Sequence, residues 1–347
     1  MTAFPAPKFN QFTLENFQLE SGIVLPQVHL AYRISGTPSA KPPIVTCTAF
    51  SQTYYDLAYL RGPKLALDPK KDWIVHTELL GNGRSSSPSN TPPPFNGANF
   101  PAVTIRDNVA LQYAFLQHLG VKEIRAVIGA SMGGQQAIQW AVTYPEMVQN
   151  AVVIVGNCRA SWHVRLFLNA LGNCIRSDPA FKEGHYTTAP LDGLSRMSEA
   201  WAPWTFSPEF YSSQEYQHYA DTRAASLAEF LAKWRTRYHD KDANDLLCHF
   251  QTWSNHDVSL TPGMEESLEK ALRSVKARVL FLPSRADAYF ALPDIVAEAA
   301  LLPKAELIVL DSIYGHAAGF GRAKADREQI NRAIANFLAP EGMINFS

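Results

Sequence analysis

No run of apolar residues in this sequence approaches the ~18 that a membrane-spanning helix needs. The first residues also lack a basic stretch followed by an apolar run, so we expect no secretory signal. Lys and Arg number 31 and Asp and Glu number 32, which leaves a net charge of −1. That charge gives no electrostatic reason to bind nucleic acid or an anionic membrane surface. We therefore expect a cytoplasmic protein without nucleic acid or membrane partners.

Cysteine is scarce, and its spacing excludes the common zinc patterns. The four cysteines are far apart and form no C-x-x-C pair: Cys47, Cys158, Cys174 and Cys248. Without an export signal, reduced and mostly buried thiols are expected rather than disulfides. The sequence also has no P-loop and no Rossmann glycine signature. We therefore expect neither a metal nor a cofactor.

Short apolar segments with strand character alternate with helical segments in the first half of the chain. The strand-like segments are two strands around a turn at 12–36 and single strands at 44–50, 73–80, 124–130 and 151–156. The helical segments are 104–119 and 133–144. This alternation predicts an α/β fold with a mostly parallel sheet that is flanked by helices on both faces.

The pattern changes at about residue 160, where the chain becomes aromatic-rich and helical in character. Four of the seven tryptophans lie between residues 160 and 240: Trp162, Trp201, Trp204 and Trp234. Strand-like segments return at 277–283 and 306–310, and a final helix follows at 325–338. We therefore expect a core interrupted by a helical lid: core residues 1–160, lid residues 161–272 and core residues 273–347.

The segment Gly129-Ala130-Ser131-Met132-Gly133 fits the pattern G-x-S-x-G. It stands between a predicted strand and a predicted helix, which is the context of the nucleophile elbow in α/β-hydrolase folds. Glycines on both sides permit the sharp turn that exposes the serine hydroxyl. We therefore predict that Ser131 is the nucleophile. The backbone N–H of Met132, at the helix start, would then face the substrate carbonyl.

The base should be a histidine late in the chain, because the elbow requires the order serine, acid, histidine. His316 follows the last predicted strand, stands in a glycine-flanked loop, and is the last histidine of the chain. From there its imidazole can take the proton of Ser131 and return it to the leaving group. His316 is therefore the predicted general base.

The acid should follow the preceding strand, and Asp287 lies four residues after Pro283 at the end of that strand. Asp294 is a competitor, but it stands at a probable helix start where N-capping explains an aspartate. Asp311 also competes, although it lies very near His316 in sequence. Asp287 is the favoured partner, since its carboxylate can fix the imidazole tautomer.

A second oxyanion donor usually comes from the loop after an earlier strand. Here that loop is 48–51, and the backbone N–H of Phe50 is the predicted donor. The alternative is that Phe50 only packs in the core. The two interpretations are compatible, because the oxyanion hole needs only the backbone N–H of Phe50 and packing involves its side chain.

These motifs make the chain resemble the homoserine O-acetyltransferase family of α/β-hydrolase-fold enzymes over nearly its full length. The matching stretches are FPAVTIRDNVALQ, LGVKEIRAVIGASMGGQQAIQWAVTYPEMV, SDPAFKEGHY, DANDLL and SIYGH. The resemblance implies acyl transfer from acetyl-CoA through an acyl-serine, and a possible homodimer through the helical lid. By position it assigns the triad to Ser131, Asp287 and His316. It assigns the oxyanion donors to Phe50 and Met132.

Two positions depart from the family pattern, and both concern the amino-acid substrate. The family arginine that grips the homoserine carboxylate is replaced by Asn173, and the aspartate after the catalytic histidine is replaced by Ala317. Each missing charge-assisted contact is worth roughly 1.5–3 kcal/mol, which argues against homoserine as the acceptor. Arg84, in a loop that also differs, either restores one charge or is simply solvated.

The sequence therefore predicts an enzyme whose small-molecule substrate is an uncharged or moderately apolar ester, lactone or amide. The reaction would be hydrolysis through an acyl-Ser131 intermediate. One alternative is a CoA-dependent O-acyltransferase with an acceptor other than homoserine. Further alternatives are a non-catalytic binding protein, or a lyase or cyclase, on the same fold.

Our first prediction is that the protein does not acetylate L-homoserine efficiently with acetyl-CoA. A pocket that binds a zwitterion has to pair both of its charges, because an unpaired buried charge costs several kcal/mol. Steady-state assays of the unmodified protein measure this directly. A kcat/KM of about 10⁴ M⁻¹s⁻¹ or better would show that the prediction is wrong.

Overall fold

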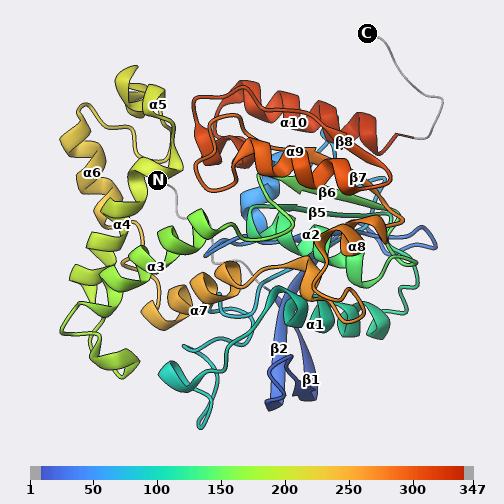
Figure 1. Cartoon of the computed structure of the whole chain (residues 1–347), viewed down its shortest axis with the longest axis horizontal. Helices are drawn as coiled ribbons and strands as arrows, with labels where there is room; N and C mark the ends of the chain where they lie inside the picture. Colours follow the sequence, from blue (N-terminus) through green and yellow to red (C-terminus); the bar gives the residue numbers. More distant parts are fainter. Residues whose placement is uncertain (1–8, 340–347) are drawn as a thin grey trace.

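The computed structural model describes residues 9–339, and an eight-stranded sheet forms the centre of the molecule (Figure 1). The strand order is β1-β2-β4-β3-β5-β6-β7-β8. The strands are β1 Asn10–Gln18, β2 Val24–Ser35, β3 Ile44–Cys47, β4 Ile74–Thr77, β5 Ala126–Ala130, β6 Asn150–Ile154, β7 Arg278–Leu282 and β8 Ala305–Leu307. Strand β2 pairs antiparallel with β1 and β4, and every other pairing is parallel. The predicted mostly parallel α/β sheet is confirmed.

The parallel strands are buried on both faces, which explains their unbroken apolar sequences. In β5, for example, Val127 packs into one hydrophobic cluster while Ala126 and Ile128 pack into the other. Helices α1, α2, α8 and α9 supply the first cluster, and α10 supplies the second. Their bounds are α1 Ile105–His118, α2 Met132–Thr143, α8 Leu268–Arg273, α9 Leu292–Leu301 and α10 Lys324–Phe337.

Between β6 and β7 the chain leaves the sheet and forms a group of helices to one side of it (Figure 1). These helices are α3 Trp162–Arg176, α4 Leu191–Thr205, α5 Pro208–Ser212, α6 Leu227–Arg235 and α7 Ala243–Ser254. We call this group the helical insertion. The short helix α8 packs instead on α9 of the core.

Strands β3, β4 and β8 each end three residues before the predicted end, and β6 ends two residues before it. Strand β3 stops at Cys47, because residues 49–52 form a tight turn with a hydrogen bond from Gln52 N–H to Ala49 O (3.1 Å). Strand β8 pairs only with β7 and stops at Leu307, with a single further bridge between Leu310 and Ser284. An edge strand has one hydrogen-bonding neighbour instead of two, so less pairing extends it.

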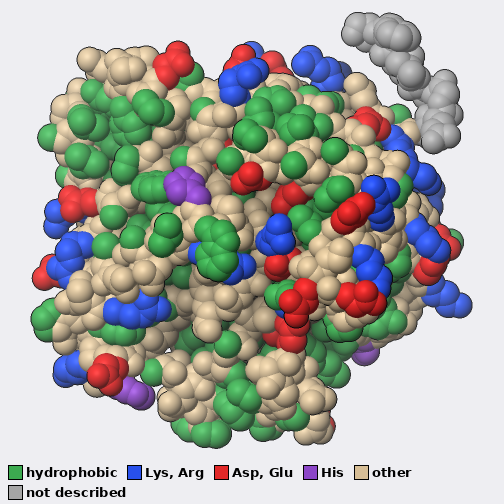
Figure 2. All heavy atoms as spheres, in the orientation of Figure 1, with side chains coloured by type: hydrophobic (Ala, Val, Ile, Leu, Met, Phe, Trp, Pro, Cys, Tyr) green, Lys and Arg blue, Asp and Glu red, His purple; other side chains and the backbone are tan. Residues whose placement is uncertain are grey.

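The described residues contain no helix long and apolar enough to span a bilayer. On the face drawn in Figure 2, acidic and basic side chains are interspersed. This mixture agrees with the small net charge of the sequence.

Candidate active site

The turn between β5 and α2 holds Ser131 in a strained backbone conformation, with φ 55° and ψ −124°. Glycine is required on both sides of this turn. A Cβ on Gly129 would lie 2.1 Å from the carbonyl carbon of Gly133, and a Cβ on Gly133 would lie 2.3 Å from Cys47 O. Ser131 is the N-cap residue of α2, but its side chain makes no capping hydrogen bond. Its hydroxyl is therefore available for chemistry.

His316 lies in the 3₁₀ helix Gly315–Phe320 and contacts Asp287, which follows β7. The distance from His316 Nδ1 to Asp287 Oδ2 is 2.7 Å. The other carboxylate oxygen, Oδ1, accepts hydrogen bonds from the backbone N–H groups of Tyr289 (2.8 Å) and Phe290 (3.3 Å). A carboxylate fixed in this way holds the proton on Nδ1 and leaves Nε2 free to act as a base.

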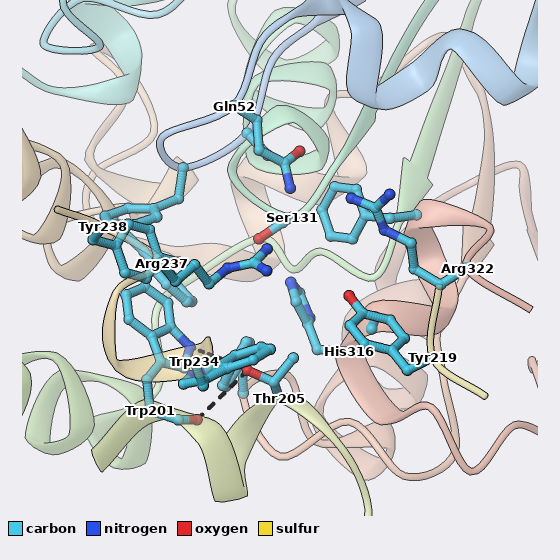
Figure 3. A pocket seen from close by; sticks show the side chains of 16 residues that line it. Gln52, Ser131, Trp201, Thr205, Tyr219, Trp234, Arg237, Tyr238, His316 and Arg322 are labelled. Carbon is cyan, nitrogen blue, oxygen red and sulfur yellow. Dashed lines mark hydrogen bonds between the residues drawn. The ribbon is translucent and has the colours of Figure 1, made fainter. Parts of the chain in front are cut away.

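Ser131 and His316 both line a cavity of ≈70 Å³, and Figure 3 shows their side chains converging there. Within the described part of the chain, Ser131 Oγ is not hydrogen-bonded to His316. Such contacts often form only when a substrate binds. The structure thus brings together the three residues that the sequence singled out as a triad.

The two competing aspartates lie elsewhere. Asp311 is exposed and pairs with Arg285 at 2.9 Å. Asp294 lies in the first turn of α9, whose N-cap residue is Ala291, so the capping role expected for Asp294 is wrong. Asp294 lines a different cavity, together with Arg159.

The backbone N–H groups of Phe50 and Met132 have no hydrogen-bond acceptor in residues 9–339. Met132 is the first residue of α2, where backbone N–H groups have no partner within the helix. Phe50 lies in the turn after β3 and also lines the cavity of Ser131. Its ring stacks on Phe250 at 5.1 Å, so Phe50 both packs and presents a free N–H.

The wall of the cavity is mostly aromatic and comes largely from the helical insertion. The insertion supplies Trp201, Tyr219, Trp234, Tyr238 and Trp253.

The wall also contains two arginines that the sequence analysis missed, Arg237 and Arg322. Arg322 pairs with Asp221 at 3.3 Å and with Asp56 at 3.7 Å. Arg237 points toward Ser131 in Figure 3 and has its guanidinium 4.7 Å from the Trp234 ring. The aromatic wall therefore also carries positively charged side chains. Arg237 lies in an irregular part of the insertion and Arg322 in the short loop before α10, and single arginines in such segments leave no periodic signal that could have placed them.

Only one of the three expected substrate contacts lies at the cavity. Ala317 lines it, next to His316. Asn173 is exposed on α3, with only a long contact of 3.5 Å to Arg176. Arg84 lies outside the cavity, with its guanidinium 4.7 Å from the Phe9 ring. Ala317 therefore still disfavours homoserine as the acceptor. Asn173 does not bear on the acceptor, because it lies outside the cavity.

Glu78 is a buried carboxyl group just behind the turn that carries Phe50. Its oxygens accept hydrogen bonds from Tyr54 N–H (2.9 Å) and from the Asn82 amide (2.7 Å). Burial nevertheless raises the pKa of Glu78 to about 8. The hydrogen bonds and Arg84 act in the opposite direction but do not cancel the loss of solvation.

No group of three or more His, Cys, Asp and Glu side chains within residues 9–339 is arranged to hold a metal ion. The four cysteines are unpaired thiols. The chemistry that the cavity offers is therefore that of Ser131, His316 and the two free N–H groups.

Known proteins resemble the chain over most of its length. A sequence profile for the alpha/beta hydrolase fold matches residues 65–172. An ethyl acetate hydrolase from Pseudomonas veronii is 33% identical over 338 residues, which covers 95% of each protein. A homoserine O-acetyltransferase from Trichormus variabilis is 32% identical over 350 residues, covering 95% of this chain and 94% of the relative. The solved structure of an acetyl esterase has a TM-score of 0.92 at 33% identity, covering 96% of this chain and 97% of that chain.

The raised pKa of Glu78 predicts a pH dependence of stability. In the unfolded chain a glutamate titrates near ~4.3, so between that pH and about 8 the unfolded state loses a proton that the folded state keeps. The contribution of Glu78 to stability is fully present below the unfolded pKa. As the pH rises from there to about 8, this contribution is lost, and the free energy of unfolding falls by at most ~1.4 kcal/mol per pH unit.

Glu78→Gln removes the titrating group, so its free energy of unfolding should fall less steeply between pH 5 and 8 than that of the wild type. Urea unfolding at four pH values measures both slopes. Glu123→Gln, at an exposed position, is the matched control and should keep the wild-type slope. Equal slopes for Glu78→Gln and the wild type would contradict the prediction.

Proposed function

This chain belongs to the family of α/β-hydrolase-fold enzymes that contains homoserine O-acetyltransferases and acetyl esterases, and we propose that it is a serine ester hydrolase for short acyl groups. The observation that carries the proposal is the convergence of Ser131 and His316 in a cavity of only ≈70 Å³. A space of this size favours an acetyl group over a long acyl chain. The ethyl acetate hydrolase and acetyl esterase similar to this chain point to the same substrate class.

The proposed reaction starts when His316 Nε2 takes the proton of the Ser131 hydroxyl and Oγ attacks the ester carbonyl carbon. The carbonyl oxygen becomes an oxyanion that accepts hydrogen bonds from the N–H groups of Phe50 and Met132. His316 then donates its proton to the departing alcohol, which leaves acetyl-Ser131. Water, activated by the same imidazole, releases acetate and regenerates the serine. Asp287 stabilises the imidazolium in both halves of the reaction.

A second candidate function is transfer of the acyl group to an alcohol other than homoserine. It is supported by the full-length similarity to a homoserine O-acetyltransferase. In that reaction an alcohol takes the place of water in the second half. Ala317 lacks the carboxylate that an ammonium group would need, so the acceptor would be uncharged at that end.

We also propose that the helical insertion is a lid over the cavity, within the predicted lid residues 161–272 and between core parts 1–160 and 273–347. The predicted range also takes in most of α8, which packs on α9 of the core. A homodimer through this lid is supported by two large apolar side chains on α3, Trp162 and Leu166, which are 78% and 70% exposed.

Sedimentation velocity tests the dimer, and Trp162→Glu should shift the protein to monomer. A monomeric wild type would overturn it. The cytoplasmic location stays a prediction.

The acyl-length preference tests the main proposal. The wild type should hydrolyse 4-nitrophenyl acetate, and kcat/KM should fall by ~100-fold or more from the acetyl to the octanoyl ester, because the small cavity beside Ser131 leaves little room for the longer chain. Initial rates over the ester series measure this. A flat or rising series would contradict the short-acyl preference.

Ser131→Ala should keep the fold and lose at least ~10³-fold in kcat on the acetyl ester. Circular dichroism shows whether the variant is folded. Comparable turnover by folded Ser131→Ala and the wild type would sink the acyl-serine mechanism.

A further inference from the structure

His249, on α7 of the helical insertion, contacts the turn that presents Phe50. The side chain is almost fully buried, at 1% exposure. Its Nδ1 accepts a hydrogen bond from the Ser51 backbone N–H at 3.1 Å, and its Nε2 lies 3.1 Å from Leu80 O. A backbone N–H can only donate and a carbonyl oxygen can only accept, so these partners select the neutral tautomer with the proton on Nε2.

The imidazole remains in this form over a wide pH range. Burial lowers the pKa of His249 to about 4, and the bond to Leu80 O opposes this only in part. An imidazolium would carry a proton on Nδ1, which would face the Ser51 N–H donor. Above the lowered pKa the ring therefore keeps its acceptor for Ser51.

The turn needs such support, because its backbone is strained. Ser51 has φ 53°, a left-handed conformation that residues with side chains rarely adopt. On the side of the core, Thr48 O accepts a hydrogen bond from Gln136 Nε2 at 2.9 Å. On the side of the insertion, the Phe250 ring stacks on Phe50, next to the hydrogen bond that Ser51 N–H donates to His249 Nδ1. Helix α7 thus holds the turn at two consecutive residues.

We propose that His249 is a positioning residue for the oxyanion hole. Its Nδ1 fixes the Ser51 peptide, and thereby directs the preceding Phe50 N–H at the acyl oxygen of a substrate attached to Ser131. This inference rests on the proposed esterase function and extends it, because it makes a helix outside the sheet part of the transition-state geometry. His249 itself touches no reacting atom.

Two substitutions at His249 separate positioning from packing. His249→Asn places its side-chain oxygen close to the position of Nδ1, so it keeps an acceptor for Ser51 N–H. His249→Leu fills a similar volume but has no acceptor. His256→Leu is the matched control, because His256 is a second histidine with 1% exposure, just beyond the end of α7, bonded to Asn157 O (3.3 Å) and not to the turn.

His249→Leu should lower kcat for 4-nitrophenyl acetate by ~30-fold, somewhat less than the loss of an oxyanion donor itself, with KM changed by less than ~3-fold. His249→Asn should stay within ~5-fold of the wild type in kcat. His256→Leu should lower the melting temperature and leave kcat unchanged.

A second measurement reports on the oxyanion alone. Trifluoroacetone adds to a serine hydroxyl and gives a tetrahedral adduct whose negatively charged oxygen occupies the oxyanion hole. The inhibition constant of trifluoroacetone should rise in His249→Leu by about the same factor as kcat falls. In His256→Leu it should remain near the wild-type value.

The outcomes are distinct. Unchanged kcat and inhibition constant in His249→Leu would overturn the positioning role and leave only packing. Equal losses in His249→Asn and His249→Leu would also overturn it, because the acceptor would then not matter. A wild type with no turnover of any ester in the series would instead refute the proposed function.

Discussion

The close approach of α2 to the ends of β5 and β3 is the constraint on which the site depends. Gly129 and Gly133 leave no room for a Cβ, so the backbone can turn within one residue and place Ser131 at φ 55°. Such a conformation costs on the order of 1–3 kcal/mol and persists only where surrounding packing determines it. Helix α2 provides that packing, since 11 of its 12 residues are buried.

The parallel sheet brings the other reacting groups to the same place. Strands β3, β5 and β7 run in one direction, so the segments that follow them emerge at the same edge of the sheet. These segments carry Phe50, Ser131 and Asp287. The proximity of residues almost 240 positions apart in sequence is therefore a consequence of topology. The helical insertion then contributes aromatic side chains to the cavity wall and, through His249, contacts the turn of Phe50.

The sequence predicted what local patterns encode. Alternating apolar segments gave the strand and helix positions to within a few residues, and chain order led to the three residues that converge at the cavity. It failed where contacts depend on the path of the irregular insertion. Arg237 and His249 reach the site from segments without a motif, and Asn173 has the family position but lies on the outer side of its helix. Residue spacing alone cannot show which side of a helix faces a distant cavity.

The two arginines of the cavity are compatible with a neutral substrate, because each has partners within the protein: aspartates for Arg322 and aromatic rings for Arg237. Arg322 contacts both Asp221 and Asp56. Neither aspartate lines the cavity, so Arg322 has its counter-charges outside the space that a substrate would occupy. A charged substrate would disturb this pairing, whereas an uncharged ester leaves it intact. The Arg237 guanidinium lies over the rings of Trp234 (4.7 Å) and Tyr238 (5.9 Å), and these cation–π contacts let it line an aromatic cavity without requiring an anion from the substrate.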